Sequence, residues 1–530
     1  MGIIEQLEDR ALLSVVLTGM RNIGQVDLPT GVPAQYSGAI DQTTGFGYFG
    51  SASGANPGIV SKINLNGPLP TVVQDGLPNS VPLNVGHFNA IEIDTTAADA
   101  TQHYLYVAGN SGHILKMSPG DATHDPQVAA QLAATSASGG ILGGAIDTSN
   151  VDPTQRYAYF LVMETSDSKL LRVRLSDFSD QGSETLNMGN ARTCAIDTIH
   201  HYLYCTTYPS TTVTVPQICK VNLATFTPGG SSTATCSMGS TTPGDGIAIA
   251  GYDNPGFDIG LSIDPVHQFA YLGSFNATSD ASKSQTYPYN QSIIVRVNLG
   301  NGDAFPAHPI SVLKLGIGEQ DLTASVIDLA HGNVYFGTDL TYPGHVYKIH
   351  VGDGTQPMTE IGRLDLNLGT AGSYPPDGTP GGIPNNTPEN GGEIYLRSAV
   401  FNATQNAIYF GTDGRPGQII KVATALGGDA NVDGMVDVAD LGALASHYGT
   451  TSGAVWAQGD FDWNGTVDVA DLGALATNYG ASLPSGAASA AMAASNQPID
   501  SASGAPTPDF SVQPADFDWL FRKKSRPLAA

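Results

Sequence analysis

The sequence predicts a mainly β protein, in which a seven-bladed β-propeller precedes a small α-helical domain near the C-terminus. Three observations support this fold class. One segment recurs seven times before residue 425, and a different, paired repeat follows it. Glycine and proline are abundant, with 63 and 33 residues, and only 13% of the residues are charged. Such a composition favours many short strands joined by turns.

The repeat of the first 425 residues has a constant order of parts. An Ile-Asp pair ends one strand, a turn follows, a strand rich in Tyr and Phe comes next, and a β-branched strand ends near Asn-Leu. The copies occupy 38–50, 91–109, 144–162, 194–206, 261–274, 325–338 and 399–412, each with its third strand beyond. Seven units of about four strands each predict a seven-bladed propeller. The rhythm resembles YVTN- and NHL-type propeller repeats.

The ends of the repeat region predict how the ring closes. The seventh copy runs out of sequence after Val422, before a fourth strand. The segment IGQVDL at 23–28 matches IGRLDL at 361–366, the fourth strand of the sixth copy. We therefore expect the N-terminal segment to supply the outer strand of the last blade and to cover an open sheet edge. The expected propeller spans residues 20–425.

A recurring aspartate ends the first strand of six copies, and Asn402 replaces it in the seventh. These residues are Asp41, Asp94, Asp147, Asp197, Asp264 and Asp328. A ring of ligands is one interpretation. The favoured one is that each side chain accepts hydrogen bonds from the backbone of the following turn. The repeated Tyr/Phe pairs are expected to pack the blades.

Two stretches from Gly428 and Gly459 read as calcium loops that run directly into helices. The first places Asp429, Asn431, Asp433, Met435, Asp437 and Asp440 at loop positions 1, 3, 5, 7, 9 and 12. The second places Asp460, Asp462, Asn464, Thr466, Asp468 and Asp471 there. Alternate oxygens of a tight loop suit the six to eight ligands of calcium, with a backbone carbonyl at position 7 and a glycine at position 6. The sequence thus predicts two calcium ions, and a solvated acidic turn is the alternative.

The duplicated loop and helix resemble a type I dockerin over about residues 427–481. Position 12 is Asp instead of the Glu usual in EF-hands, no full helix fits before the first loop, and Val436–Ala445 is repeated identically as Val467–Ala476. The resemblance implies binding to a cohesin module, with a link to polysaccharide catabolism. It also implies that positions 10 and 11 contact the cohesin, here Val438 and Ala439, then Val469 and Ala470. Because neither repeat contains Lys or Arg, a purely intramolecular calcium role is the alternative.

Charge and motifs exclude several functions. The formal net charge is −26, so a nucleic-acid partner is not expected. No apolar stretch is long enough for a transmembrane helix. No phosphate loop, HExxH or GxSxG motif is present, so an enzyme is not favoured, although a hydrolase or lyase acting on polysaccharide stays open. QLEDRALLS at 6–14 resembles the LEPR-type export motif, which makes residues 1–19 a leader and predicts an extracellular or cell-surface bacterial protein.

The sequence also makes predictions for its four cysteines, for four loop tyrosines and for the C-terminal region. Cys194, Cys205, Cys219 and Cys236 lie within one short region, which suggests one or two disulfides, with buried free thiols as the alternative. Tyr287, Tyr289, Tyr342 and Tyr374 lie in long Gly/Pro-rich loops and could stack on sugars or a partner. Residues 426–481 form the expected calcium domain, and residues 482–530 read as a flexible tail.

Together these expectations describe an exported calcium-binding protein. Its propeller would bind a ligand or partner, and its dockerin would attach it to a cohesin-bearing scaffold or cell surface. Two alternatives remain: a propeller enzyme displayed through the same dockerin, and a purely structural surface protein.

Overall fold

The computed structural model describes residues 20–482 with gaps in the connecting loops. The gaps are 30–31, 33, 52–57, 74–86, 122–123, 134–139, 165–167, 187–190, 208–217, 231–234, 238–259, 275–291, 307–309, 316–320, 340–343, 353, 367–394 and 414–416. The leader expected at 1–19, most of the expected tail, and Tyr287, Tyr289, Tyr342 and Tyr374 lie outside the described residues.

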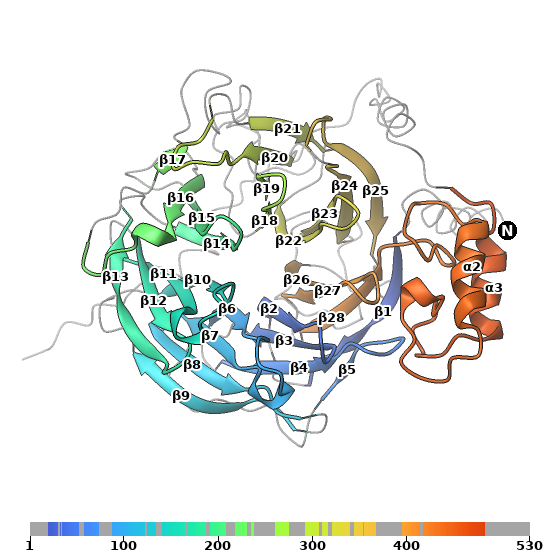
Figure 1. Cartoon of the computed structure of the whole chain (residues 1–530), viewed down its shortest axis with the longest axis horizontal. Helices are drawn as coiled ribbons and strands as arrows, with labels where there is room; N and C mark the ends of the chain where they lie inside the picture. Colours follow the sequence, from blue (N-terminus) through green and yellow to red (C-terminus); the bar gives the residue numbers. More distant parts are fainter. Residues whose placement is uncertain are drawn as a thin grey trace, which may run out of the picture.

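Seven four-stranded antiparallel sheets stand around a central axis and form the propeller (Figure 1). The predicted mainly β, seven-bladed fold is thus confirmed. Blades 1 to 3 consist of β2 (Gln35–Asp41), β3 (Phe46–Ser51), β4 (Val60–Asn64) and β5 (Thr71–Val72); β6 (Phe88–Ile93), β7 (Leu105–Gly109), β8 (His113–Ser118) and β9 (Gln127–Ala133); β10 (Ile141–Asp147), β11 (Tyr157–Met163), β12 (Ser168–Arg174) and β13 (Ser179–Thr185).

Blades 4 to 6 follow in chain order. They consist of β14 (Ala191–Asp197), β15 (Tyr202–Thr207), β16 (Ile218–Asn222) and β17 (Thr235–Ser237); β18 (Leu261–Asp264), β19 (Phe269–Gly273), β20 (Ile293–Asn298) and β21 (Ile310–Lys314); β22 (Leu322–Asp328), β23 (Asn333–Thr338), β24 (His345–His350) and β25 (Thr359–Asp365). Short 3-10 turns, Ala100–Gln102, Pro153–Gln155 and Leu223–Thr225, lie between strands.

Blade 7 takes its outer strand from the other end of the chain. Its inner three strands are β26 (Leu396–Asn402), β27 (Ala407–Thr412) and β28 (Gln418–Ala423). The fourth is β1 (Arg21–Asp27), which pairs antiparallel with β28 in a register that joins Arg21 to Ala423 and Asp27 to Gln418. The first and last strands of the propeller therefore close the ring together.

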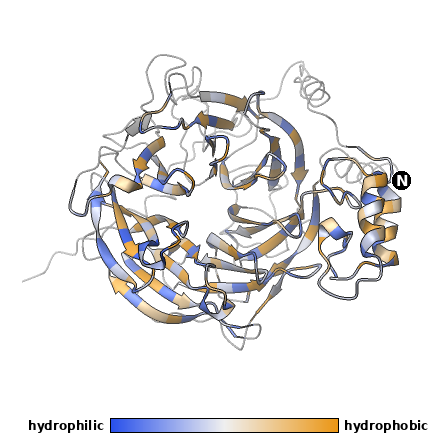
Figure 2. Cartoon of the chain, viewed as in Figure 1, coloured by the Kyte–Doolittle hydropathy of each residue, from blue (hydrophilic) through white to orange (hydrophobic). Residues whose placement is uncertain are grey.

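Aromatic residues of the second strands fill the space between blades. Tyr48, Tyr106, Tyr204, Tyr271 and Tyr335 are among the largest fully buried side chains. Each core cluster between blades combines two neighbouring ones, as where Tyr48 of blade 1 packs with Phe88 of blade 2. Hydrophobic residues accordingly lie along the strands throughout the ring (Figure 2).

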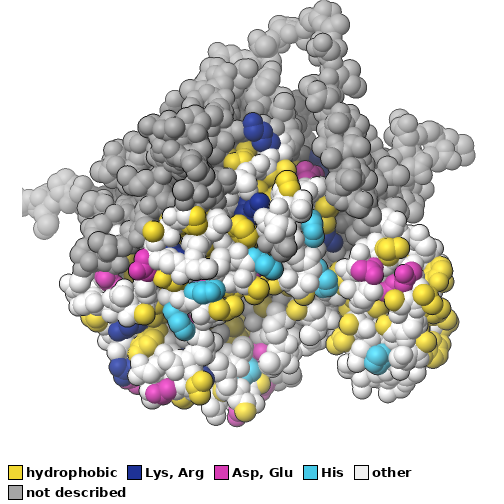
Figure 3. Space-filling model, turned by 45° about the horizontal axis from the view of Figure 1, so that its top comes forward, with side chains coloured by type: hydrophobic (Ala, Val, Ile, Leu, Met, Phe, Trp, Pro, Cys, Tyr) yellow, Lys and Arg dark blue, Asp and Glu magenta, His cyan; other side chains and the backbone are white. Residues whose placement is uncertain are grey.

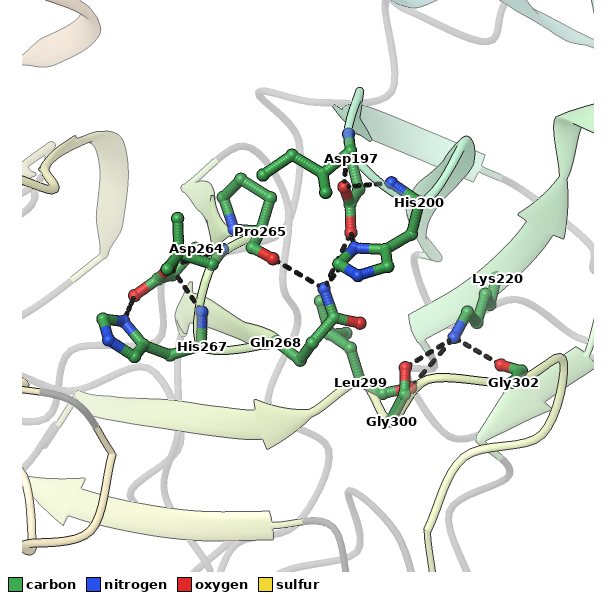
Figure 4. A network of polar contacts seen from close by, with 12 residues as sticks. Asp197, His200, Lys220, Asp264, Pro265, His267, Gln268, Leu299, Gly300 and Gly302 are labelled. Carbon is green, nitrogen blue, oxygen red and sulfur yellow. Dashed lines mark hydrogen bonds and ion pairs between the residues drawn. The ribbon is translucent and has the colours of Figure 1, made fainter.

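The recurring aspartates cap the turns that follow them, as predicted. The Asp264 carboxylate accepts hydrogen bonds from the Val266 and His267 amides, both at 3.0 Å. Asn402 does the same for Thr404 in blade 7, at 3.1 Å. Equivalent bonds occur at Asp41, Asp94, Asp147, Asp197 and Asp328. Figure 4 shows the Asp197 and Asp264 turns.

A basic residue of each third strand joins its blade to the next. In blade 4, Lys220 Nζ donates to the Leu299 and Gly300 carbonyls of blade 5, both at 3.0 Å (Figure 4). Lys62, Lys116, Arg296, Lys348 and Lys421 also donate to a carbonyl of the next blade. Arg172 lies over the Phe226 ring of blade 4, 4.3 Å from its centroid. Every junction of the ring therefore has a basic side chain, including the junction between blades 7 and 1.

The cysteines stand opposite one another across blade 4. Strand register pairs Cys194 with Cys205, Cys205 with Cys219, and Cys219 with Cys236. Cys219 is disulfide-bonded, whereas Cys194 and Cys205 are free thiols. The disulfide at Cys219 agrees with the expected one or two disulfides, and Cys194 and Cys205 take the alternative of free thiols. Burial raises the pKa of both free thiols, which disfavours their thiolate form.

Two helices follow the propeller. They are α2 (Val438–His447) and α3 (Val469–Asn478), separated by a 3-10 turn at Trp456–Gln458, and they lie side by side next to β1 (Figure 1). Each begins where the sequence predicted a helix, directly after an acidic loop. Among the described residues, no helix is long and apolar enough to cross a membrane.

Candidate metal centre

The first acidic loop, residues 429–440, is folded around its own carboxylates. The Asp429 carboxylate accepts the amides of Asp433 and Gly434, at 3.2 and 3.0 Å. Gly434 has a φ of +85°, a conformation in which a side chain would be strained. Asp440 closes the loop, because its two oxygens accept the Ala430 and Asp437 amides, both at 2.8 Å. The first and last positions are thereby held together.

The second loop, residues 460–471, repeats this arrangement. The Asp460 carboxylate accepts the Asn464 and Gly465 amides, at 3.0 and 2.9 Å. Asp471 accepts the Phe461 and Asp468 amides, at 2.8 and 2.9 Å. Two loops that share no segment of chain therefore reach the same geometry from the same residue pattern.

Loop 2 brings three acidic side chains together. Carboxylate oxygens of Asp460, Asp462 and Asp471 lie within 4.8 Å of one another. The Asn464 side-chain amide donates to Asp462 at 3.0 Å, so its oxygen is near the same group. All donors are oxygen atoms, which is the donor type calcium prefers.

The remaining predicted ligands lie at the other positions of the two loops. Asp437 and Asp468 cap α2 and α3 by accepting the Ala439 and Ala470 amides, at 2.7 and 2.8 Å. Asn431 donates to Asp433 at 2.9 Å in loop 1. Met435 and Thr466 stand at position 7, where the amide of each bonds to the side chain of position 5.

Burial and mutual repulsion disfavour the charged form of these carboxylates when no cation is bound. Burial raises the pKa of Asp429 to about 7, and the nearby charges of Asp440 and Asp433 add to the rise. Burial likewise raises the pKa of Asp460 to about 7, with Asp471 and Asp462 adding to it. A bound cation would relieve both effects, because it replaces lost hydration and offsets the repulsion. The residues present therefore fit a calcium ion.

The two helices expose an uncharged apolar surface. The side chains at loop position 10, Val438 and Val469, are 70% and 71% exposed. Ala439 and Ala470 beside them are exposed, as are Tyr448, Leu472 and Tyr479. Figure 3 shows hydrophobic side chains along the outer edge of this part of the molecule, next to acidic ones. All four residues that the sequence proposed for partner contact thus lie on the surface.

The propeller has a separate polar cavity in its channel, of about 150 Å³. Inner strands line it with Tyr36, Asn89, Glu92, Cys194, Ser325 and Arg397, among others. The Arg397 guanidinium forms an ion pair with Asp339 at 2.8 Å and lies over the Tyr36 ring. Burial raises the pKa of Glu92 to about 8, so this carboxyl is largely protonated at neutral pH.

The sequence analysis missed this cavity, although it held a signal. Glu92 stands two residues before Asp94, at a position where the other copies have Ala39, Ala145, Ala195, Ser262, Val326 or Val400. A single acid in a series of uncharged residues marks a position that the repeat itself does not explain.

Comparisons with known proteins show similarity of shape only. No protein-family model matches the chain, and no curated protein matches it. Among solved structures, hydrazine synthase from Kuenenia stuttgartiensis has a TM-score of 0.49 at 9% identity, over 74% of this chain and 97% of that one. U3-55K has a TM-score of 0.47 at 9% identity, over 75% and 98%. The RRP9 WD40 repeats have a TM-score of 0.47 at 8% identity, over 76% and 99%. We draw no functional conclusion from these similarities.

Proposed function

We propose that the protein binds two calcium ions in its C-terminal loops and is held on a partner protein through α2 and α3, with the propeller as its ligand- or partner-binding part. The observation that carries this proposal is the group formed by Asp460, Asp462 and Asp471. Loop 1 would hold its ion with the equivalent oxygens of Asp429, Asn431, Asp433, Asp437 and Asp440 and the Met435 carbonyl. Loop 2 would also use Asn464, Asp468 and the Thr466 carbonyl.

The partner we propose is a cohesin-type module on an extracellular scaffold or cell surface. Support comes from the dockerin-like sequence pattern and from the exposure of Val438 and Val469. An apolar surface without Lys or Arg suits a partner that contributes its own apolar residues. Export through the LEPR-type motif and a role in polysaccharide breakdown belong to the same proposal. The propeller's own ligand would be small and polar, because Glu92 and Arg397 border a cavity of about 150 Å³.

Terbium(III), which replaces calcium in oxygen sites, gives a direct test on the full chain. Trp463 lies within loop 2, and the Trp456 indole donates to the Asp429 carbonyl of loop 1. Both loops should therefore sensitise terbium emission, and calcium should displace it. Calorimetry should count two calcium ions per chain. No emission and no calcium uptake would contradict the proposal.

The same titration should depend on pH. Calcium binding needs deprotonated carboxylates in each loop. The pKa of Asp429 and of Asp460 is about 7 in the cation-free protein. Calcium affinity should therefore fall about tenfold per loop between pH 8 and pH 6. The stability of the cation-free protein should show the opposite trend. The pKa of Asp429 is raised in the folded state, so its contribution to the free energy of unfolding is fully present below the unfolded pKa of 3.8 and is lost as the pH rises through 7. Affinity that is equal at both pH values would contradict the assignment of these two ligands.

The docking surface is tested by Val438→Asp and Val469→Asp, singly and together. Each adds a charge to an exposed apolar position, so calcium uptake and folding should be retained. Binding to a cohesin-type module should weaken at least tenfold in the double variant, because a charge would be buried unpaired. Val151→Asp on the propeller, also highly exposed, is the matched control and should not alter binding. Equal binding by the double variant and the control would exclude this surface.

A further inference from the structure

The second acidic loop touches the propeller where its ring closes. Trp463, at position 4 of loop 2, is only 3% exposed. Its indole N–H donates to the Gln405 carbonyl at 2.9 Å, in the turn between β26 and β27 of blade 7. The Trp456 amide bonds to the Thr404 carbonyl of the same turn at 3.4 Å. The C-terminal loops are therefore packed on the last blade.

Basic side chains from both strands of the closing pair face Trp463. Lys421 of β28 lies 4.2 Å from the centroid of its ring, and the Arg21 guanidinium of β1 lies at 5.8 Å. Lys421 Nζ also donates to the Gly67 carbonyl of blade 1 at 2.8 Å and to Gln405 at 3.1 Å. One lysine thus links blade 7, blade 1 and loop 2.

An apolar core continues this contact. Ala423 and Leu426, at and after the end of β28, pack in one cluster with residues of both loops and both helices, and Ile23 of β1 packs against that cluster. The C-terminal members include Trp456, Phe461, Trp463, Val467 and Leu475. The propeller seam and the calcium loops therefore share a hydrophobic core.

The two loops differ at the residue that makes this contact. Position 4 is Val432 in loop 1 and Trp463 in loop 2, and both residues are left-handed, with φ of +57° and +58°. Loop geometry therefore does not require a tryptophan. What distinguishes Trp463 is its set of partners on the propeller.

We infer that the C-terminal loops act as a clasp, that is, a contact on β1 and β28 that stabilises the closed propeller ring. We further infer that calcium in loop 2 strengthens the pairing between β1 and β28. The calcium part of this inference rests on the proposed function. Trp463 stands between the proposed ligands Asp462 and Asn464, so an ion held by its neighbours restrains its backbone. Without calcium, repulsion among its carboxylates loosens loop 2 and weakens the contact of Trp463 with Lys421 and Arg21.

Hydrogen exchange of the full chain, with calcium or with chelator, tests this inference. Calcium should slow exchange of the amides of β1 and β28 on the order of tenfold. Amides of β9, the outer strand of blade 2, should not change. In Trp463→Val, which places the residue of loop 1 at the same φ, calcium should no longer slow exchange in β1. Terbium emission and calorimetry on the same samples report whether each loop is loaded.

The outcomes separate the two proposals. Calcium uptake with unchanged β1 exchange in the wild type overturns the clasp and leaves calcium binding intact. No calcium uptake overturns the proposed function and the calcium part of the clasp. Equal β1 exchange in the wild type and Trp463→Val, both in calcium, overturns the clasp altogether. Arg21→Gln lies outside the loops and should also weaken the calcium effect on β1, so the inference remains testable if Trp463→Val does not fold.

Discussion

An internal deletion of residues 20–30 should lower the melting temperature of the propeller by roughly 10 °C or more. The deletion removes β1, the outer strand of blade 7, and exposes the backbone of β28 along its whole length. It also removes Met20 and Leu28, which are 0% and 2% exposed. Each such side chain contributes about 1.5–3 kcal/mol on burial. The lost strand hydrogen bonds add about 0.5–1.5 kcal/mol each.

Scanning calorimetry or far-ultraviolet circular dichroism during heating measures this effect. A deletion of the same length after residue 482 is the control, because it leaves every described strand in place. We also expect the shortened chain to associate more readily, since an open strand edge pairs with other chains. A melting temperature equal to that of the control would show that β1 does not hold the ring closed.

Replacing the last carboxylate of each loop, Asp440→Ala and Asp471→Ala, should unfold the loop and the start of the helix after it. Both carboxylates are about 1% exposed or less, and each accepts amides from the start and the end of its loop. Without them, buried amides lose their partners, at a cost of about 1–3 kcal/mol each. The proposed ion would lose a ligand as well.

Each single variant should bind one calcium ion in place of two, and the double variant none. Circular dichroism at 222 nm should report the lost helix, and calorimetry the lost ion. Asp152→Ala is the control, because Asp152 caps a short 3-10 turn on the propeller surface and belongs to neither loop. Two bound ions in the double variant would show that these carboxylates are not ligands.

The features that depend on residues close together in the sequence could be predicted from it. The seven copies predict seven blades because each copy forms the sheet of one blade, with β1 completing the seventh. The turn aspartates were interpreted correctly because an acceptor two or three residues before an amide is a local arrangement. The order of oxygen donors in the acidic loops is local too, and the structure shows helices directly after both loops.

The pairing of β1 with β28 was predicted because residues 23–28 match the fourth strand of the sixth copy, but the other arrangements between remote segments needed the tertiary structure. Each copy carries a basic residue in its third strand, but its carbonyl partners lie in the next blade, about 60 to 80 residues away for Lys62 and Lys220. Glu92 and Arg397 meet in one cavity, and Trp463 meets Arg21, only because the ring brings the ends of the chain together. Strand pairing in blade 4 likewise decides which cysteines stand opposite one another. Sequence spacing determines local hydrogen bonds, whereas distances between blades follow from the closure of the whole ring.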